Sequence, residues 1–136
     1  MDTSNKIKNI DTKEKISILW IIVVMNMIFA DICSFMIPGA LKDIMTGNTP
    51  FEITQGLMLV FAIMLEIPIA MIILSRLLKY KANRWTNMVA SVITIIYVIG
   101  GGSAYLHYYF FATIEIACMI AIIWFSWKWK NIEPSV

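Results

Sequence analysis

The sequence predicts an all-α integral membrane protein, a bundle of four membrane-spanning helices. Three observations lead to this fold class: 60% of the 136 residues are hydrophobic, only 15% are charged, and the apolar residues gather in four long runs. A soluble domain is nearer half apolar and a quarter charged, so lipid is the expected solvent for most of this chain. The net charge of only +2 does not indicate a nucleic-acid partner.

Each apolar run is long enough to cross a bilayer, which takes about 20 mostly apolar residues in a helix. Helices are expected because a helix satisfies the hydrogen bonds of its own backbone within lipid. The alternating polarity of membrane β-strands is absent. The predicted transmembrane domain is residues 16–127, between a basic cytoplasmic tail (1–15) and a second cytoplasmic tail (128–136), with spans of about 16–36, 55–78, 86–106 and 108–127.

Local signals support these limits in order along the chain. The first run exceeds the roughly 7–15-residue core of a signal peptide and lacks a small-x-small cleavage site, so it is expected to stay as an anchor. Pro38 and Gly39 close it, and the stretch Thr46–Pro50 predicts a turn in the loop that follows. Residues 1–15 are compatible with a short amphipathic helix on the membrane surface, but the usual mobility of chain ends favours a solvated tail.

The basic residues are distributed very unevenly. Ten of the eleven Lys and Arg residues lie before the first run, at the junction of the second and third, or after the fourth, and Lys42 alone lies on the other side. The positive-inside rule therefore predicts a multi-pass protein of the cell membrane with both termini in the cytoplasm. Trp20, Trp85, Trp127 and Trp129 fall near the predicted inner boundary, where indole rings prefer the headgroup zone.

Three carboxylates lie within the predicted spans, namely Asp31, Glu66 and Glu115. Such groups are costly in lipid, so they are expected to face the interior of the bundle and are candidates for function. Asp31 and Glu115 each lie about 10 Å from the outer boundary, which predicts that they meet across the first and fourth spans. Two carboxylates in a low dielectric cannot both ionise easily. They are expected to hold a proton or a cation, or else to make interhelical hydrogen bonds.

Glu66 is predicted near the midplane, about 16 Å from the outer boundary. Pro68 follows it by two residues and lacks an N–H, so a backbone carbonyl near Glu66 loses its helical partner. Interrupted helices of this kind form cation sites in transporters, although proline is also tolerated in spans with a structural role alone. Glu66 is therefore the third candidate for proton or cation binding, and Pro68 is a supporting residue.

The third predicted span has a polar side at helical spacing, formed by Asn87, Ser91, Thr94 and Gly101. This pattern is typical of a helix–helix contact. The more specific alternative is that this side lines a polar path through the membrane, in which Ser91 and Thr94 would be supporting residues.

Two further residues are candidates for a supporting role. His107 is the single histidine, lies at the outer boundary and could titrate near neutral pH. Cys118 lies one turn from Glu115 and is expected to line the same space, whereas Cys33 is expected to point elsewhere. Because no cluster has the spacing of metal ligands, neither a metal nor a cofactor is predicted.

Several short stretches resemble a known family: Ala30–Gly39, Asn83–Asn87, Ile114–Ile116 and Trp124–Trp129. Together they resemble a family of small four-span prokaryotic integral membrane proteins of unknown function, and the resemblance covers nearly the whole chain. It implies a topology and no activity. Small multidrug-resistance exporters also have four spans and an acidic residue in the first, but there the carboxylate lies near the middle of the span. DoxX-like four-helix proteins share the size and architecture, but this chain has no redox motif.

Three functions follow from these patterns. The leading hypothesis is a proton- or cation-coupled transporter, expected to be a homo-oligomer because four spans enclose little space. The first alternative is a non-catalytic accessory or binding subunit of a membrane complex, and the second is a DoxX-like redox-linked membrane protein. The loops are too short for a soluble catalytic domain, and no nucleophile–base or haem-ligand pair indicates an enzyme. The expected partners are the lipid bilayer and further copies of the chain or another membrane protein.

Overall fold

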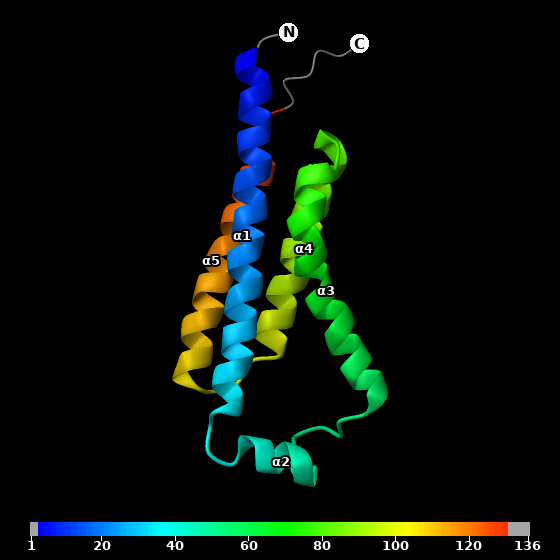
Figure 1. Cartoon of the computed structure of the whole chain (residues 1–136), viewed down its shortest axis with the longest axis vertical. Coiled ribbons are helices and arrows are strands. Elements are labelled where there is room, and N and C mark those ends of the chain that lie inside the picture. Colours follow the sequence, from blue (N-terminus) through cyan, green and yellow to red (C-terminus); the bar gives the residue numbers. More distant parts are fainter. Residues whose placement is uncertain (1–2, 131–136) are drawn as a thin grey trace.

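The computed structural model describes residues 3–130, which form five α-helices and no strands within that range (Figure 1). Three of the helices, α1, α3 and α5, are long and apolar enough to cross a membrane. The fold is therefore all-α, and the composition of its helices indicates a multi-pass membrane protein. The helices are α1 (Thr3–Phe35), α2 (Ala40–Thr46), α3 (Gln55–Leu77), α4 (Tyr80–Gly100) and α5 (Leu106–Lys128).

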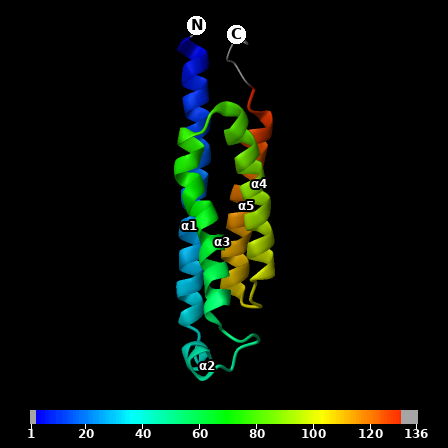
Figure 2. The same cartoon turned by 90° about the vertical axis from the view of Figure 1, so that its right-hand side faces the viewer.

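The four long helices run alongside one another (Figures 1 and 2). Both α1 and α4 pack against α3 and α5. The beginning of α1 and the end of α5 lie at one end of the molecule, and the short helix α2 lies across the opposite end (Figure 1). Towards that opposite end α3 diverges from α1, so the helices are packed most closely near the chain ends. Pro68, which stands within α3, allows such a helix to bend because it lacks an N–H.

Helix α4 differs from the other long helices because its polar side is buried. Asn83, Asn87 and Ser91 are fully buried, whereas Val89 and Ile96 are among the exposed residues of its opposite side. The predicted helix–helix contact along this polar side is therefore confirmed. The same distribution explains why α4 falls below the hydropathy that the other three long helices reach, since the polar residues that lower its mean face protein and not lipid.

Two helices extend differently from the predicted segments. Helix α1 begins at Thr3 and continues without interruption, so the part of the predicted solvated tail that is described is helical. Asp11 and Lys15 form an ion pair of 2.7 Å there, one helical turn apart, and such pairs favour a helix. Helix α4 begins at Tyr80 and ends at Gly100. Residues 101–105, which were predicted to belong to the third span, form the turn to α5 instead.

The loop between α1 and α3 contains more structure than predicted. Residues 40–46 form α2, and Gly47 ends that helix with φ 71°, a left-handed conformation that glycine adopts easily. The turn predicted over Thr46–Pro50 is thus confirmed at its first residues. The predicted C-terminal tail lies outside the described residues from position 131 onwards.

A network of polar side chains joins three helices near the chain ends. Trp20, which was predicted to lie in the headgroup zone, is fully buried, and its Nε1 donates to Oδ1 of Asn87 at 2.7 Å. Ser75 Oγ donates to the same oxygen at 3.0 Å. The Asn87 amide donates to Asn83 Oδ1, and Asn83 Nδ2 donates to the carbonyl of Ser75 at 2.6 Å. These four residues, called the polar network below, tie α1, α3 and α4 together.

Candidate functional site

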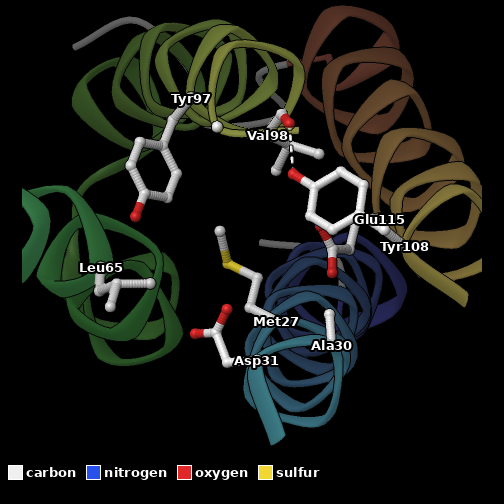
Figure 3. Close-up of a pocket in the computed structure, with 9 residues that line it drawn as sticks. Met27, Ala30, Asp31, Leu65, Tyr97, Val98, Tyr108 and Glu115 are labelled. Atoms are coloured by element: carbon white, nitrogen blue, oxygen red, sulfur yellow. Dashed lines mark hydrogen bonds between the residues drawn. The ribbon is translucent and has the colours of Figure 1, made fainter. Parts of the chain in front are cut away.

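A small cavity lies between the four long helices, in the half of the molecule farther from the chain ends (Figure 3). It leaves about 70 Å³ to the centres of water molecules. Because one water needs roughly 10–15 Å³ by this measure, the cavity has room for several waters. Its walls come from α1 (Met27, Ala30, Asp31), α3 (Leu65), α4 (Tyr97, Val98, Gly101) and α5 (Tyr108, Glu115).

The two carboxylates of the cavity are Asp31 and Glu115, from α1 and α5 (Figure 3). Glu115 is only 3% exposed, whereas Asp31 is exposed and lies on the side of α1 towards α3 (Figure 3). No Lys or Arg is among the residues that line the cavity. Within the described part of the chain, neither carboxylate has a hydrogen-bond or ion-pair partner. The sequence therefore located a shared cavity correctly, but the two side chains make no direct hydrogen bond.

Two tyrosines complete the polar lining, and sequence reasoning missed both. Tyr97 directs its hydroxyl into the cavity (Figure 3), and its ring packs edge-on against Phe61 at 6.4 Å. Tyr108 also lines the cavity, and its hydroxyl donates to the carbonyl of Val98 at 2.5 Å. Continuing the polar side of α4 by one more turn beyond Thr94 would have indicated Tyr97.

The hydrogen bond from Tyr108 depends on how α4 ends. Near the end of a helix the last carbonyls lack intrahelical partners. Gly102 donates its N–H to Ile99 at 3.4 Å, so the carbonyl of Val98 is left for the Tyr108 hydroxyl. A Cβ on Gly102 would lie 3.3 Å from the Tyr108 ring and 3.2 Å from the Ile99 oxygen. Glycine at this position lets the turn approach Tyr108 closely.

Glu66 does not line the cavity, and it does not face the interior of the bundle as expected for a carboxylate within a span. It is exposed on α3, whereas its neighbour Leu65 contributes to the cavity wall. Consecutive residues of a helix point about 100° apart, and the interior side of α3 is the one that carries Leu65 and the buried Pro68. The position of Glu66 was predicted incorrectly because the sequence gives the depth of a residue along a span. It does not show which side of a mostly apolar helix packs against the other helices.

The supporting residues also lie outside the cavity. Cys118 is half-buried and packs against the apolar core, and it is not among the residues that line the cavity, contrary to the prediction. His107 Nε2 lies 3.2 Å from Ser34 Oγ and joins α5 to α1. Thr94 donates to the carbonyl of Ala90 in its own helix at 2.8 Å. Ser91 Oγ is buried, with no hydrogen-bond partner in the described part of the chain.

The cavity is closed on the side of the chain ends. Met27 forms part of its wall, and the next turns of α1 carry Val23 and Trp20, both fully buried. Met71 of α3 and Met119 of α5 belong to the same apolar core. Beyond this core lies the polar network. To reach the other end of the molecule, a solute in the cavity would therefore have to pass this apolar core and then the hydrogen-bonded side chains of the polar network.

The comparisons with known proteins bear on the whole chain. One family model, described as a family of unknown function (DUF6326), matches residues 6–135. The chain belongs to this family. The match covers all five helices except the first three residues of α1, and it agrees with the resemblance found in the sequence. No curated protein and no solved structure matches the chain. Because DUF6326 has no known function, the chemistry of the cavity has to carry the functional argument.

Proposed function

We propose that the chain is a four-span protein of the prokaryotic cell membrane, in which α1, α3, α4 and α5 form a four-helix bundle with both termini in the cytoplasm. The burial of the polar side of α4 supports its inclusion as a span, since the surface it would show to lipid is apolar. The basic residues support the orientation. A reporter enzyme fused after Val136 is expected to be active only in the cytoplasm, and one inserted at Asn48 only outside. The reverse result would overturn the orientation.

Within this bundle, the cavity is proposed to bind a proton or a monovalent cation during coupled transport. One observation carries the proposal: two carboxylates without hydrogen-bond partners in the described chain share a cavity that has no basic residue in its lining. Its negative charge favours a positive ligand. Its volume of about 70 Å³ is well below the roughly 300 Å³ at which pockets for organic ligands begin, so a small inorganic cation or a proton is the better fit.

The oxygen atoms around the cavity suit such a ligand. Carboxylate and hydroxyl oxygens are hard donors that suit hard cations, and the Tyr97 hydroxyl faces the same space (Figure 3). A proton would reside on one carboxyl and be shared with the other through water. Because the cavity is closed towards the chain ends, transport requires the helices to rearrange. The bend that Pro68 permits in α3 is a suitable hinge, since α3 forms one wall of the cavity through Leu65.

The test uses purified protein in liposomes that contain a pH-sensitive dye. An imposed Na⁺ or K⁺ gradient is expected to drive a pH change in wild type, and Glu115→Gln and Asp31→Asn are expected to abolish it. Glu52→Gln is the matched control, because it makes the same change on an exposed residue that does not line the cavity. A carbodiimide is expected to label Glu115 less when the bound cation is present.

Two results would overturn the transport proposal. Wild-type flux retained in a folded Glu115→Gln variant would remove the cavity from the mechanism. Absence of flux in wild type, together with carbodiimide labelling that no cation affects, would favour the accessory-subunit function instead.

The exposed position of Glu66 favours a second proposal about assembly. A carboxyl facing lipid without a partner is costly, and Glu66 lies between the exposed Ala62 and Ala70, one turn before and one turn after it. Small residues allow close helix approach in membranes. We infer that a second copy of the chain packs on this side of α3. A two-fold axis would place Glu66 against its own counterpart, where protonated carboxyls can hydrogen-bond to each other.

Cysteine cross-linking tests this interface. In a background with Cys33 and Cys118 replaced by serine, Ala62→Cys is expected to form a disulfide-linked dimer in the membrane. Val89→Cys, on the exposed side of α4, is the control. Equal cross-linking of the two variants would contradict the proposed interface, whereas flux through the cavity would be judged separately by the liposome assay.

A further inference from the structure

The N-terminal part of α1 projects beyond the other long helices (Figures 1 and 2). Its 33 residues span about 50 Å at 1.5 Å per residue, whereas the hydrocarbon core of a bilayer is about 30 Å thick. Helices α3 and α5 have 23 residues each and end near the same level. The first turns of α1 therefore stand over the membrane surface, beside the turn that joins α3 to α4.

A groove lies between this projecting segment and its neighbours. Lys6, Asn9 and Lys13 line it from one side of α1, at the helical spacing i, i+3, i+7. The turn from Leu77 to Tyr80 forms the second wall, and Trp129 after α5 forms the third. The groove leaves about 510 Å³ to the centres of water molecules, several times the volume of the Asp31–Glu115 cavity. It is called the basic groove below.

The walls of the basic groove are held together by hydrogen bonds. Trp129 Nε1 donates to Oδ1 of Asn9 at 2.9 Å, and the Tyr80 hydroxyl donates to the carbonyl of Trp129 at 2.5 Å. Lys13 Nζ donates to the carbonyl of Leu78 at 2.8 Å. These bonds connect α1, the α3–α4 turn and the end of α5. The groove is therefore built by the fold, and its shape does not depend on free surface side chains alone.

The charge of the basic groove has one sign. Lys6, Lys13 and Lys79 line it, and no Asp or Glu does so in the described part of the chain. On the projecting segment, Asp11 is paired with Lys15 at 2.7 Å, and Glu14 is exposed outside the lining. Lys13 donates to the carbonyls of Leu78 at 2.8 Å and Arg76 at 3.5 Å, which leaves one of its three N–H groups for an anion. The groove thus offers three ammonium groups to an anion.

The apolar part of the groove identifies the kind of anion. Leu77 lines it and is 73% exposed, and Ile10 lines it from α1 with 51% exposure. Inorganic phosphate has no apolar group that could contact these side chains, whereas a phospholipid carries acyl chains close to its phosphate. Trp129 and Tyr80 are of the residue types that gather in the headgroup zone, and basic pockets between membrane helices bind anionic headgroups.

We propose that the basic groove binds the headgroup of an anionic phospholipid, with its phosphate between Lys6, Lys13 and Lys79. The ammonium groups of Lys6 and Lys79 contact the phosphate oxygens. Lys13 holds the wall formed by Leu78 and contributes a third charge. The glycerol and the upper acyl chain lie against Leu77. This inference rests on the embedding of the helices in a membrane and is independent of transport through the cavity.

The test compares two double variants of the full chain that lose the same charge. Lys6→Gln with Lys79→Gln removes two ammonium groups from the groove, and Lys8→Gln with Lys81→Gln removes two exposed ones that do not line it. Binding of phosphatidylglycerol is measured by native mass spectrometry in a neutral detergent, with phosphatidylcholine as the zwitterionic comparison. Lys13 is left unchanged because its bond to Leu78 supports the fold.

The groove variant is expected to raise the apparent Kd for phosphatidylglycerol on the order of 20-fold, since each basic residue near an anionic headgroup contributes several-fold. The control variant should raise it less than about threefold, and phosphatidylcholine should bind weakly to all three proteins. Equal weakening in the two variants would overturn the proposal, because it would show only a diffuse attraction of charge. Displacement of the lipid by millimolar inorganic phosphate would also overturn it, in favour of a site for a soluble anion.

Discussion

The polar network and the Asp31–Glu115 cavity put polar side chains into the same apolar protein in opposite ways. In the network, the Asn87 amide both accepts from Trp20 and donates to Asn83, so its hydrogen-bonding groups are used. In the cavity, Glu115 is nearly as buried, yet it has no hydrogen-bond partner in the described chain. Satisfied buried networks hold a unique packing, while unsatisfied groups cost stability. The difference is consistent with a network that maintains the fold, and it supports the proposal that the cavity binds a ligand.

The comparison predicts its largest effect at Asn87. Asn87→Ala removes the acceptor of the Trp20 indole and the donor to Asn83, and it leaves both partners buried. Each such group costs about 1–3 kcal/mol when unsatisfied, so the free energy of unfolding should fall by about 3 kcal/mol. Denaturation in detergent micelles measures this loss. Asn26→Ala is the control, because the Asn26 amide donates only to Ile22 in its own helix, and its loss should stay below about 1 kcal/mol.

A smaller effect is expected at the hydrogen bond between Tyr108 and Val98, two residues that line the cavity. Tyr108→Phe leaves the Val98 carbonyl without its donor and should lower the free energy of unfolding by about 1 kcal/mol. The neighbouring Tyr109→Phe, on an exposed ring, should change it by less than about 0.5 kcal/mol. Equal effects in the same denaturation experiment would show that the Tyr108 hydroxyl does not close the end of α4.

The smallest effect is expected at Glu115. Because its carboxyl has no hydrogen-bond partner to lose in the described chain, Glu115→Gln should change the free energy of unfolding by less than about 1 kcal/mol, in either direction. The change should be slight although the residue is nearly as buried as Asn87. A loss above about 2 kcal/mol would assign Glu115 to the fold and weaken the functional interpretation of the cavity.

The sequence predicted most of the helices because apolar runs and their flanking charges are local properties. It also placed Asp31 and Glu115 at one level, since depth follows from counting residues along a helix. It misplaced Glu66 and Cys118, because the side of a helix that faces its neighbours depends on packing. In α3 and α5 nearly every residue is apolar, so no periodicity marks the inner side. In α4 the polar residues repeat at helical spacing, and there the buried side was predicted correctly.

Trp20 is a second residue whose position depends on packing that the sequence does not show. Indole rings gather at membrane boundaries, and Trp20 lies near a predicted boundary. Its indole N–H, however, donates a hydrogen bond to Asn87, which lies 67 residues farther along the chain. No local signal connects these two positions. The projection of α1 beyond the other long helices (Figures 1 and 2) was missed for a related reason. Its polar residues indicated a tail, whereas Asn9 and Lys13 make hydrogen bonds to distant segments that stabilise it as a helix.

The buried polar side of α4 has a consequence for how the protein is made. A segment enters the bilayer from the translocation machinery according to its own hydropathy, and α4 alone is less apolar than the other three long helices. Its amides face partners in α3, to which it is joined by only Leu78 and Lys79. We therefore expect α3 and α4 to enter the membrane together as a helical hairpin, with Asn83 already bonded to Ser75. The residues that hold the mature fold would then also act during biogenesis, by masking the polarity of α4 before lipid surrounds it.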